Sequence, residues 1–128
     1  MKYANSVSSS RKKERKHFFN LPSHQRRMTM SSHLSKMLQK KYNIKSIPIR
    51  KNDEVKIVRG SMKGKIGKVI QCHRKNFSIF IEKIARFKTG RSISYIPISP
   101  SNVVVVNLSI TNERKSFFLK RNNNLTPI

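Results

Sequence analysis

The sequence predicts a mainly β fold, in which a small barrel lies between a basic, partly helical N-terminal arm and a short C-terminal helix. Three observations support this. β-branched and aromatic residues gather in five short runs between residues 53 and 110, Gly, Asn, Pro and Ser separate these runs, and basic residues are frequent on either side. The chain has 128 residues, which suits one compact domain.

The N-terminal arm, residues 1–52, is polar and basic, with a net charge of +13 and almost no β-branched residues before Ile44. Such a segment buries too little apolar surface to fold alone, so we expect it to become ordered on its partner. A short helix is predicted after Pro22 and Ser23, because Pro is favoured in the first turn of a helix.

A longer helix is predicted near residues 33–42, with Ser31 and Ser32 as candidate N-caps. Its apolar residues recur with helical spacing and form one stripe: Leu34, Met37, Leu38 and Tyr42. We expect this stripe to pack on the barrel, and contact with a separate protein is the alternative.

Five strands are predicted in the central segment, residues 53–110. They cover residues 55–58, 66–72, 77–84, 92–98 and 103–108. About 60 residues are too few for an immunoglobulin-like sandwich, which needs about 100, so the strands predict a barrel of the SH3-like class. Beyond it, residues 111–128 are expected to hold a helix near 112–121 and a loose tail. In that helix Phe117, Phe118 and Leu119 would dock back onto the barrel.

The charge requires a polyanionic partner. Lys and Arg number 29 against 5 Asp and Glu, which gives a net charge of +24 and a pI of about 11.3. No apolar run reaches the ~18 residues of a membrane-spanning helix, and no secretory signal precedes the arm. We therefore expect nucleic acid, and no membrane, as the partner. A transit peptide in residues 1–16 is an alternative that composition leaves open.

The segment at residues 55–70, VKIVRGSMKGKIGKVI, reads as strand, glycine loop, strand. Gly60 and Gly64 permit positive φ and leave room for loop amides to approach a phosphate or a base. Gly67 is expected where another backbone packs closely. Four cations surround the loop: Arg59, Lys63, Lys65 and Lys68. Together with the basic arms, this predicts an RNA-binding surface.

The same segment resembles a KOW motif, and the chain around it resembles a family of large-subunit ribosomal proteins, numbered twenty-four in the universal scheme and twenty-six in eukaryotes. The runs that carry the resemblance are HFFN (17–20), PSH (22–24), RR (26–27), MSS (30–32), LSK (34–36), YN (42–43), PIRK (48–51), DEV (53–55), RG (59–60), KG (63–64), IGKV (66–69), IE (81–82) and PS (100–101).

The resemblance implies a structural constituent of the large ribosomal subunit, with an SH3-like barrel bound to large-subunit rRNA. Its arms would thread between rRNA helices near the exit of the nascent-peptide tunnel, beside neighbouring large-subunit proteins. The protein would be cytoplasmic, with assembly in the nucleolus if the source is eukaryotic.

The candidate RNA contacts are basic residues and the loop, because guanidinium binds phosphate bidentately and Lys acts as a point charge. In the arm they are Arg11, Lys12, Lys13, Arg15, Lys16, Arg26, Arg27, Lys36, Lys40, Lys41, Arg50 and Lys51. In the barrel they are Arg59, Gly60, Ser61, Lys63, Gly64, Lys65, Lys68, Arg74, Lys75 and Arg91.

We do not expect an enzyme. The five acidic residues form no recognisable acid/base pair. Cys72 precedes His73, but adjacent strand residues point to opposite faces, so they are not expected to act as nucleophile and base. The histidines and the cysteine lack zinc-site spacing, so no metal, cofactor or small-molecule substrate is expected. A KOW module that docks on RNA polymerase and a DNA-packaging protein remain as alternative classes.

Overall fold

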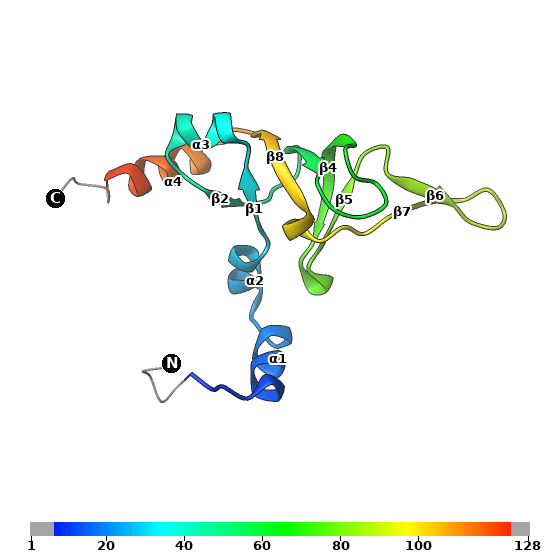
Figure 1. Cartoon of the computed structure of the whole chain (residues 1–128), viewed down its shortest axis with the longest axis horizontal. Helices are drawn as coiled ribbons and strands as arrows, with labels where there is room; N and C mark the ends of the chain where they lie inside the picture. The colour runs from blue at the N-terminus through cyan, green and yellow to red at the C-terminus, as the bar shows by residue number, and fades with distance from the viewer. Residues whose placement is uncertain (1–6, 124–128) are drawn as a thin grey trace.

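The computed structural model describes residues 7–123 (Figure 1). The elements, in chain order, are α1 (Arg11–Phe19), α2 (Ser23–Thr29), β1 (Ser31–Leu34), α3 (Lys36–Tyr42), β2 (Ser46–Pro48), β3 (Glu54–Ile57), β4 (Ile66–His73), the 3-10 turn η1 (Arg74–Asn76), β5 (Ser78–Ile81), β6 (Ala85–Phe87), β7 (Ile93–Tyr95), the 3-10 turn η2 (Pro100–Asn102), β8 (Val103–Asn107) and α4 (Asn112–Asn123). None of the helices in this range is long and apolar enough to cross a membrane.

Most strands form one six-stranded sheet in the order β2-β1-β8-β3-β4-β5, and β6 and β7 form a separate hairpin. β1 runs parallel to β8, and the other paired neighbours are antiparallel. Inward-facing Val and Ile residues of β3, β4, β5 and β8 make the core, because strand residues alternate between faces. The hairpin projects from the sheet, whereas α1 and α2 extend away from it on another side (Figure 1).

The mainly β character is confirmed, and the five predicted strands correspond to β3, β4, β5, β7 and β8. The SH3-like barrel is not confirmed. Between residues 7 and 123 no strand pairing closes the sheet upon itself. A single bridge between Ile79 and Ile98 continues the pairing beyond β5.

The predicted helix near residues 33–42 is shorter than expected, because a strand occupies its first turn. α3 begins at Lys36, and Ser35 is its N-cap, with the side chain accepting a hydrogen bond from the Leu38 amide at 3.5 Å. Ser31 and Ser32 were therefore wrongly predicted as caps. Ser32 instead is buried in β1 and donates a hydrogen bond to the Pro100 carbonyl.

The apolar stripe is divided between these two elements. Leu34 is buried in β1, where it pairs with Val105 of β8. Leu38 and Tyr42 pack against the core as predicted, but Met37 is 84% exposed, so its predicted packing is wrong. Leu34 adopts the strand conformation and not the helical one because pairing with β8, far along the chain, buries its side chain fully.

Part of the expected arm belongs to the folded core. β1 and β2 are sheet strands, and Met30, Ile44, Ile47 and Ile49 are buried in the core. Within the described part of the expected arm, residues 7–29, with α1 and α2, extend away from the sheet (Figure 1). α2 begins at Ser23 after Pro22, as predicted, whereas α1 was not predicted.

The C-terminal helix was predicted and is present as α4. Phe118 is buried and stacks on Tyr42, with ring centroids 4.6 Å apart. The predicted docking of Phe117 and Leu119, and the tail beyond residue 123, lie outside what the structure describes.

Candidate nucleic-acid interface

The loop between β3 and β4 has the glycine geometry that the sequence predicts. Gly60 and Gly64 have φ of +96° and +90°, a backbone region that residues with a side chain rarely adopt. The Gly64 amide donates to the Ile57 carbonyl at 2.9 Å, and the Lys63 amide donates to the Gly60 carbonyl at 3.1 Å. The loop is therefore a compact turn with its own backbone hydrogen bonds.

Gly67 lies where another backbone packs closely, as predicted. A Cβ atom at this position would lie 2.7 Å from Ile81 Cγ2 and 2.8 Å from the Glu82 carbonyl oxygen. Gly67 therefore lets β4 approach the end of β5 more closely than any other residue would allow.

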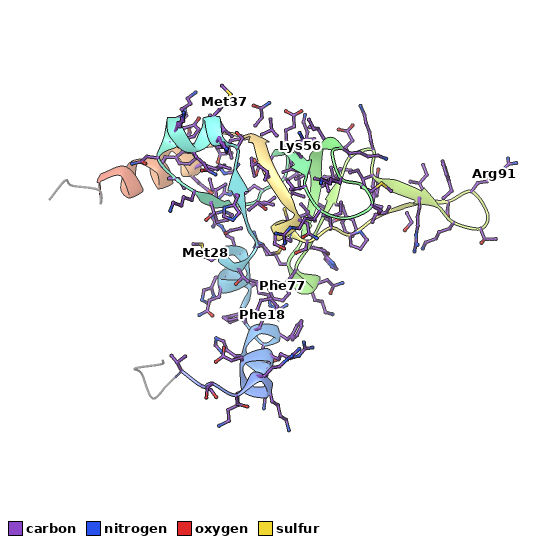
Figure 2. The ribbon with its side chains drawn as sticks, viewed as in Figure 1. Phe18, Met28, Met37, Lys56, Phe77 and Arg91 are labelled. Carbon is purple, nitrogen blue, oxygen red and sulfur yellow. The ribbon has the colours of Figure 1, made fainter. Side chains whose placement is uncertain are left out.

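The loop presents its cations to solvent. Val58 and Arg59 donate their amides to the Asn102 carbonyl, which anchors the loop to η2. The side chains of all four predicted loop cations are exposed: Arg59, Lys63, Lys65 and Lys68. Lys56 was missed, although it lies exposed between the buried Val55 and Ile57 on β3 (Figure 2), and the alternation of a strand would have found it.

Three other exposed surfaces carry predicted contacts. On α1 they are Arg11, Lys12, Lys13, Arg15 and Lys16. On α3 they are Lys36, Lys40 and Lys41. Arg91 lies at the tip of the β6–β7 hairpin (Figure 2), beside the exposed Phe87 and Ile93. The structure thus places these predicted contacts on separate faces of the molecule.

The side chain of Arg26 makes most of its contacts within the protein. Its guanidinium donates to the carbonyls of Leu21 at 2.6 Å and Phe19 at 2.7 Å, and to that of Lys75 at 3.4 Å. It also lies over the Phe77 ring, 5.4 Å from the centroid. Because Phe18 stacks on Phe77 at 4.4 Å, Arg26 and this pair of rings hold α1 and α2 against η1 (Figure 2).

A second group of arginines lines a cleft between α2, β2 and α4, which we call the arginine cleft. Its volume is about 380 Å³, and its walls include Arg27, Met28, Ile47, Pro48, Arg50 and Arg74. Arg50 is held by Glu113 of α4 at 2.8 Å and by the hydroxyl of Thr111, just before α4, at 3.3 Å. A shallower hollow next to it shares Arg27, Arg50 and Arg74 and adds Lys51.

Arg114 lines the arginine cleft and is paired with Asp53, and the structural role of this pair was not predicted. Both side chains are buried, and the Arg114 guanidinium binds the Asp53 carboxylate and donates to the Pro48 carbonyl at 2.9 Å. Asp53 also accepts the amides of Arg50 and Ser109. No sequence signal separates Arg114 from the surface cations around it, because its partner lies 61 residues away.

A family model that describes the ribosomal proteins L26 of eukaryotes and L24 of archaea matches residues 8–122. The chain belongs to this family, which we call the ribosomal L26 family. It is also similar to three curated relatives that carry the name large ribosomal subunit protein uL24. The relative from Littorina littorea is 51% identical over 116 residues, which are 90% of this chain and 81% of the relative.

The other two relatives align over nearly the whole chain. The protein of Dictyostelium discoideum is 44% identical over 122 residues, 95% of this chain and 88% of the relative. That of Schizosaccharomyces pombe is 39% identical over 121 residues, 94% of this chain and 96% of the relative. These matches confirm the resemblance seen in the sequence.

Membership in the ribosomal L26 family makes the chain a structural ribosomal protein and not an enzyme. The properties of Cys72 agree with a structural and not a catalytic role. Its thiol donates to the Ile49 carbonyl at 3.7 Å, and burial, followed by the negative charge of Asp53, raises the pKa of Cys72 above its ordinary value of 9.0. A thiol with a raised pKa is a poor nucleophile at neutral pH. Within residues 7–123, no cluster of three or more His, Cys, Asp or Glu side chains is arranged to hold a metal.

Proposed function

We propose that this ribosomal protein is a constituent of the large subunit that binds large-subunit rRNA and supports subunit assembly and translation. The observation that carries the proposal is the match of nearly the whole chain to proteins named large ribosomal subunit protein uL24. From the same resemblance we expect a position near the peptide exit tunnel, neighbouring large-subunit proteins as partners, cytoplasmic ribosomes as the location and, in a eukaryote, assembly in the nucleolus.

The exposed cations support rRNA as the ligand. RNA binding of this kind is driven mainly by neutralising phosphates and releasing counterions. Cations on α1, α3, the β3–β4 loop and the β6–β7 hairpin face different directions, so a partner that contacts all of them must surround the protein. Folded rRNA can present phosphates to several sides of a bound protein, whereas a straight duplex presents them to one side.

We also propose that the sheet, continued by the Ile79–Ile98 bridge, has the curvature of an SH3-like barrel.

Sucrose-gradient sedimentation of a native lysate tests the proposal, with the chain followed by mass spectrometry at physiological and at high salt. A constituent of the large subunit sediments with that subunit at both salt concentrations. Enrichment with RNA polymerase instead would favour a docking module, and enrichment with chromatin would favour a DNA-packaging protein. Either result would overturn the proposal.

A binding assay distinguishes a ribosomal protein from a DNA-packaging protein directly. The chain is titrated with transcripts of large-subunit rRNA and with duplex DNA of equal phosphate number at equal salt. We expect tighter binding to the rRNA transcripts, and equal affinity would contradict a ribosomal function.

A further inference from the structure

The arginine cleft is concave and combines cations with apolar lining residues, and it shares Arg27, Arg50 and Arg74 with the hollow beside it. Arg27 of α2 and Arg74 of η1 reach it from different elements, and neither has a hydrogen-bond or ion-pair partner among residues 7–123. A third arginine of the lining, Arg50, is half-buried and is held in place by Glu113. Two unpaired guanidinium groups that face one hollow are arranged to bind an anion.

The anion is expected to be a phosphate. Guanidinium is planar and offers paired N–H donors that match phosphate oxygens. Two guanidinium groups from separate elements, with Arg50 beside them, can contact one phosphate from different sides.

The apolar lining of the cleft suits a ligand that carries an apolar group as well as a phosphate. Met28, Ile47 and Pro48 line the same hollow. Ile47 and Pro48 are buried, whereas Met28 is 56% exposed, so the Met28 side chain is available for contact (Figure 2). The volume of about 380 Å³ falls in the range of small-molecule sites, about 300–1,000 Å³. A single nucleotide is of this size, whereas a base pair in a duplex cannot leave its stack to enter.

We propose that the arginine cleft holds one unpaired nucleotide of RNA, with its phosphate between Arg27 and Arg74 and its base against Met28. Proteins commonly recognise RNA through unstacked bases in loops and bulges, held by stacking and by contacts to the adjoining phosphate. The inference rests on the proposed rRNA-binding function and adds to it one site where RNA conformation, and not charge alone, is recognised.

Photocrosslinking tests the position of the nucleotide. The chain carries p-benzoylphenylalanine in place of Met28, and a matched variant carries it in place of Met37, which is 84% exposed on α3 at a separate surface (Figure 2). Both are incorporated into large subunits and irradiated, and the crosslinked nucleotides are mapped by reverse transcription. We expect the Met28 variant to crosslink to one nucleotide that is unpaired, and the Met37 variant not to crosslink to it.

Charge-preserving substitutions test the phosphate contact. Arg27→Lys and Arg74→Lys keep the charge but lose the paired donors, and Arg86→Lys, on the exposed surface of β6, is the matched control. The probes are a 12-nucleotide single-stranded RNA and a 12-base-pair RNA duplex. For each cleft variant we expect roughly tenfold weaker binding to the single strand, as for one lost charge-assisted hydrogen bond. Duplex binding should be nearly unchanged, as should both affinities of the control.

The outcomes separate this inference from the proposed function. If the wild-type chain sediments with the large subunit but Met28 crosslinks to paired RNA, to protein or to nothing, the nucleotide site is wrong and the function stands. Equal losses on single-stranded and duplex probes would likewise overturn the site. Absence of the wild-type chain from the large subunit would overturn the function and this inference with it.

Discussion

Asp53 and Arg114 form an ion pair that is shielded from water on both sides, with side-chain exposures of 0% and 3%. The carboxylate also accepts two backbone amides, so the charge is hydrogen-bonded as well as paired. At the scale of single residues this pair joins α4 to the beginning of β3.

We predict that Asp53→Asn lowers the free energy of unfolding by about 3–5 kcal/mol, because it leaves the buried Arg114 charge uncompensated. Urea unfolding followed by circular dichroism measures the change. Glu113→Gln is the control, since Glu113 is 77% exposed and its pair with Arg50 should contribute less than about 1 kcal/mol. Similar losses in the two variants would contradict a special role for the buried pair.

Cys72 provides a second prediction at this scale. Burial, and then Asp53, raise the pKa of its thiol, so fewer molecules carry the reactive thiolate at a given pH. We expect iodoacetamide to modify Cys72 more slowly in the folded protein than in urea at pH 8.5. Because the unfolded thiol ionises first, stability should also begin to fall as the pH rises through about 9. Equal alkylation rates in the two states would disprove the raised pKa.

At the scale of elements, β4 and β5 depend on a position without a side chain. We predict that Gly67→Ala destabilises the fold by about 1–3 kcal/mol, because its Cβ would overlap with Ile81 and with the Glu82 carbonyl. Ser61→Ala in the exposed loop should change stability by less than about 0.5 kcal/mol. Thermal unfolding of both variants measures the difference, and a neutral Gly67→Ala would show that the strands are free to move apart.

The attachment of α1 to η1 rests on few contacts. No residue of α1 is buried, and Phe18 connects the helix to Phe77 by ring stacking. We predict that Phe18→Ala makes trypsin cleave within residues 11–16 several-fold faster, while the sheet stays resistant, since such a stack contributes about 0.5–1.5 kcal/mol. Phe87→Ala, on the remote hairpin, is the control, and unchanged cleavage in the Phe18 variant would mean that other contacts hold the helix.

The sequence predicted the elements whose signals are local. The Val and Ile runs of β3 to β5 and β8, the cap-like Pro22 and the turn glycines Gly60 and Gly64 all act through neighbouring residues, and the structure agrees there. β1 was missed because its four residues contain one large apolar side chain, Leu34, and become a strand by pairing with distant segments.

For the candidate interface, the sequence predicted which residue types take part but not how their side chains are arranged. The exposed cations of the β3–β4 loop were expected, because basic residues around glycines rarely become buried. The internal use of Arg26, the ion pair of Arg114 and the convergence of Arg27 with Arg74 depend on how α2, η1 and α4 meet. The spacing of residues along the chain does not predict how these elements pack together.

At the scale of the whole molecule, cations on several faces predict a steep dependence of rRNA binding on salt. If ~6–10 phosphates are neutralised, affinity should fall ~10³–10⁵-fold between 50 and 200 mM salt. Filter binding with a large-subunit rRNA transcript measures the slope. A shallow slope would mean that the charge on α1, α3 and the hairpin does not contact RNA.

The parallel pairing of β1 with β8 determines when the fold can form during synthesis. Leu34 meets Val105, so β1 has no neighbour on that side until about seventy further residues have been translated. At about 5–20 residues per second that is a wait of roughly 4–14 s. Over this interval the emerging chain exposes Leu34 and Ile47, while the preceding cations repel other copies. This topology therefore leaves apolar side chains of the newborn chain unpaired, and open to aggregation, until β8 has been made.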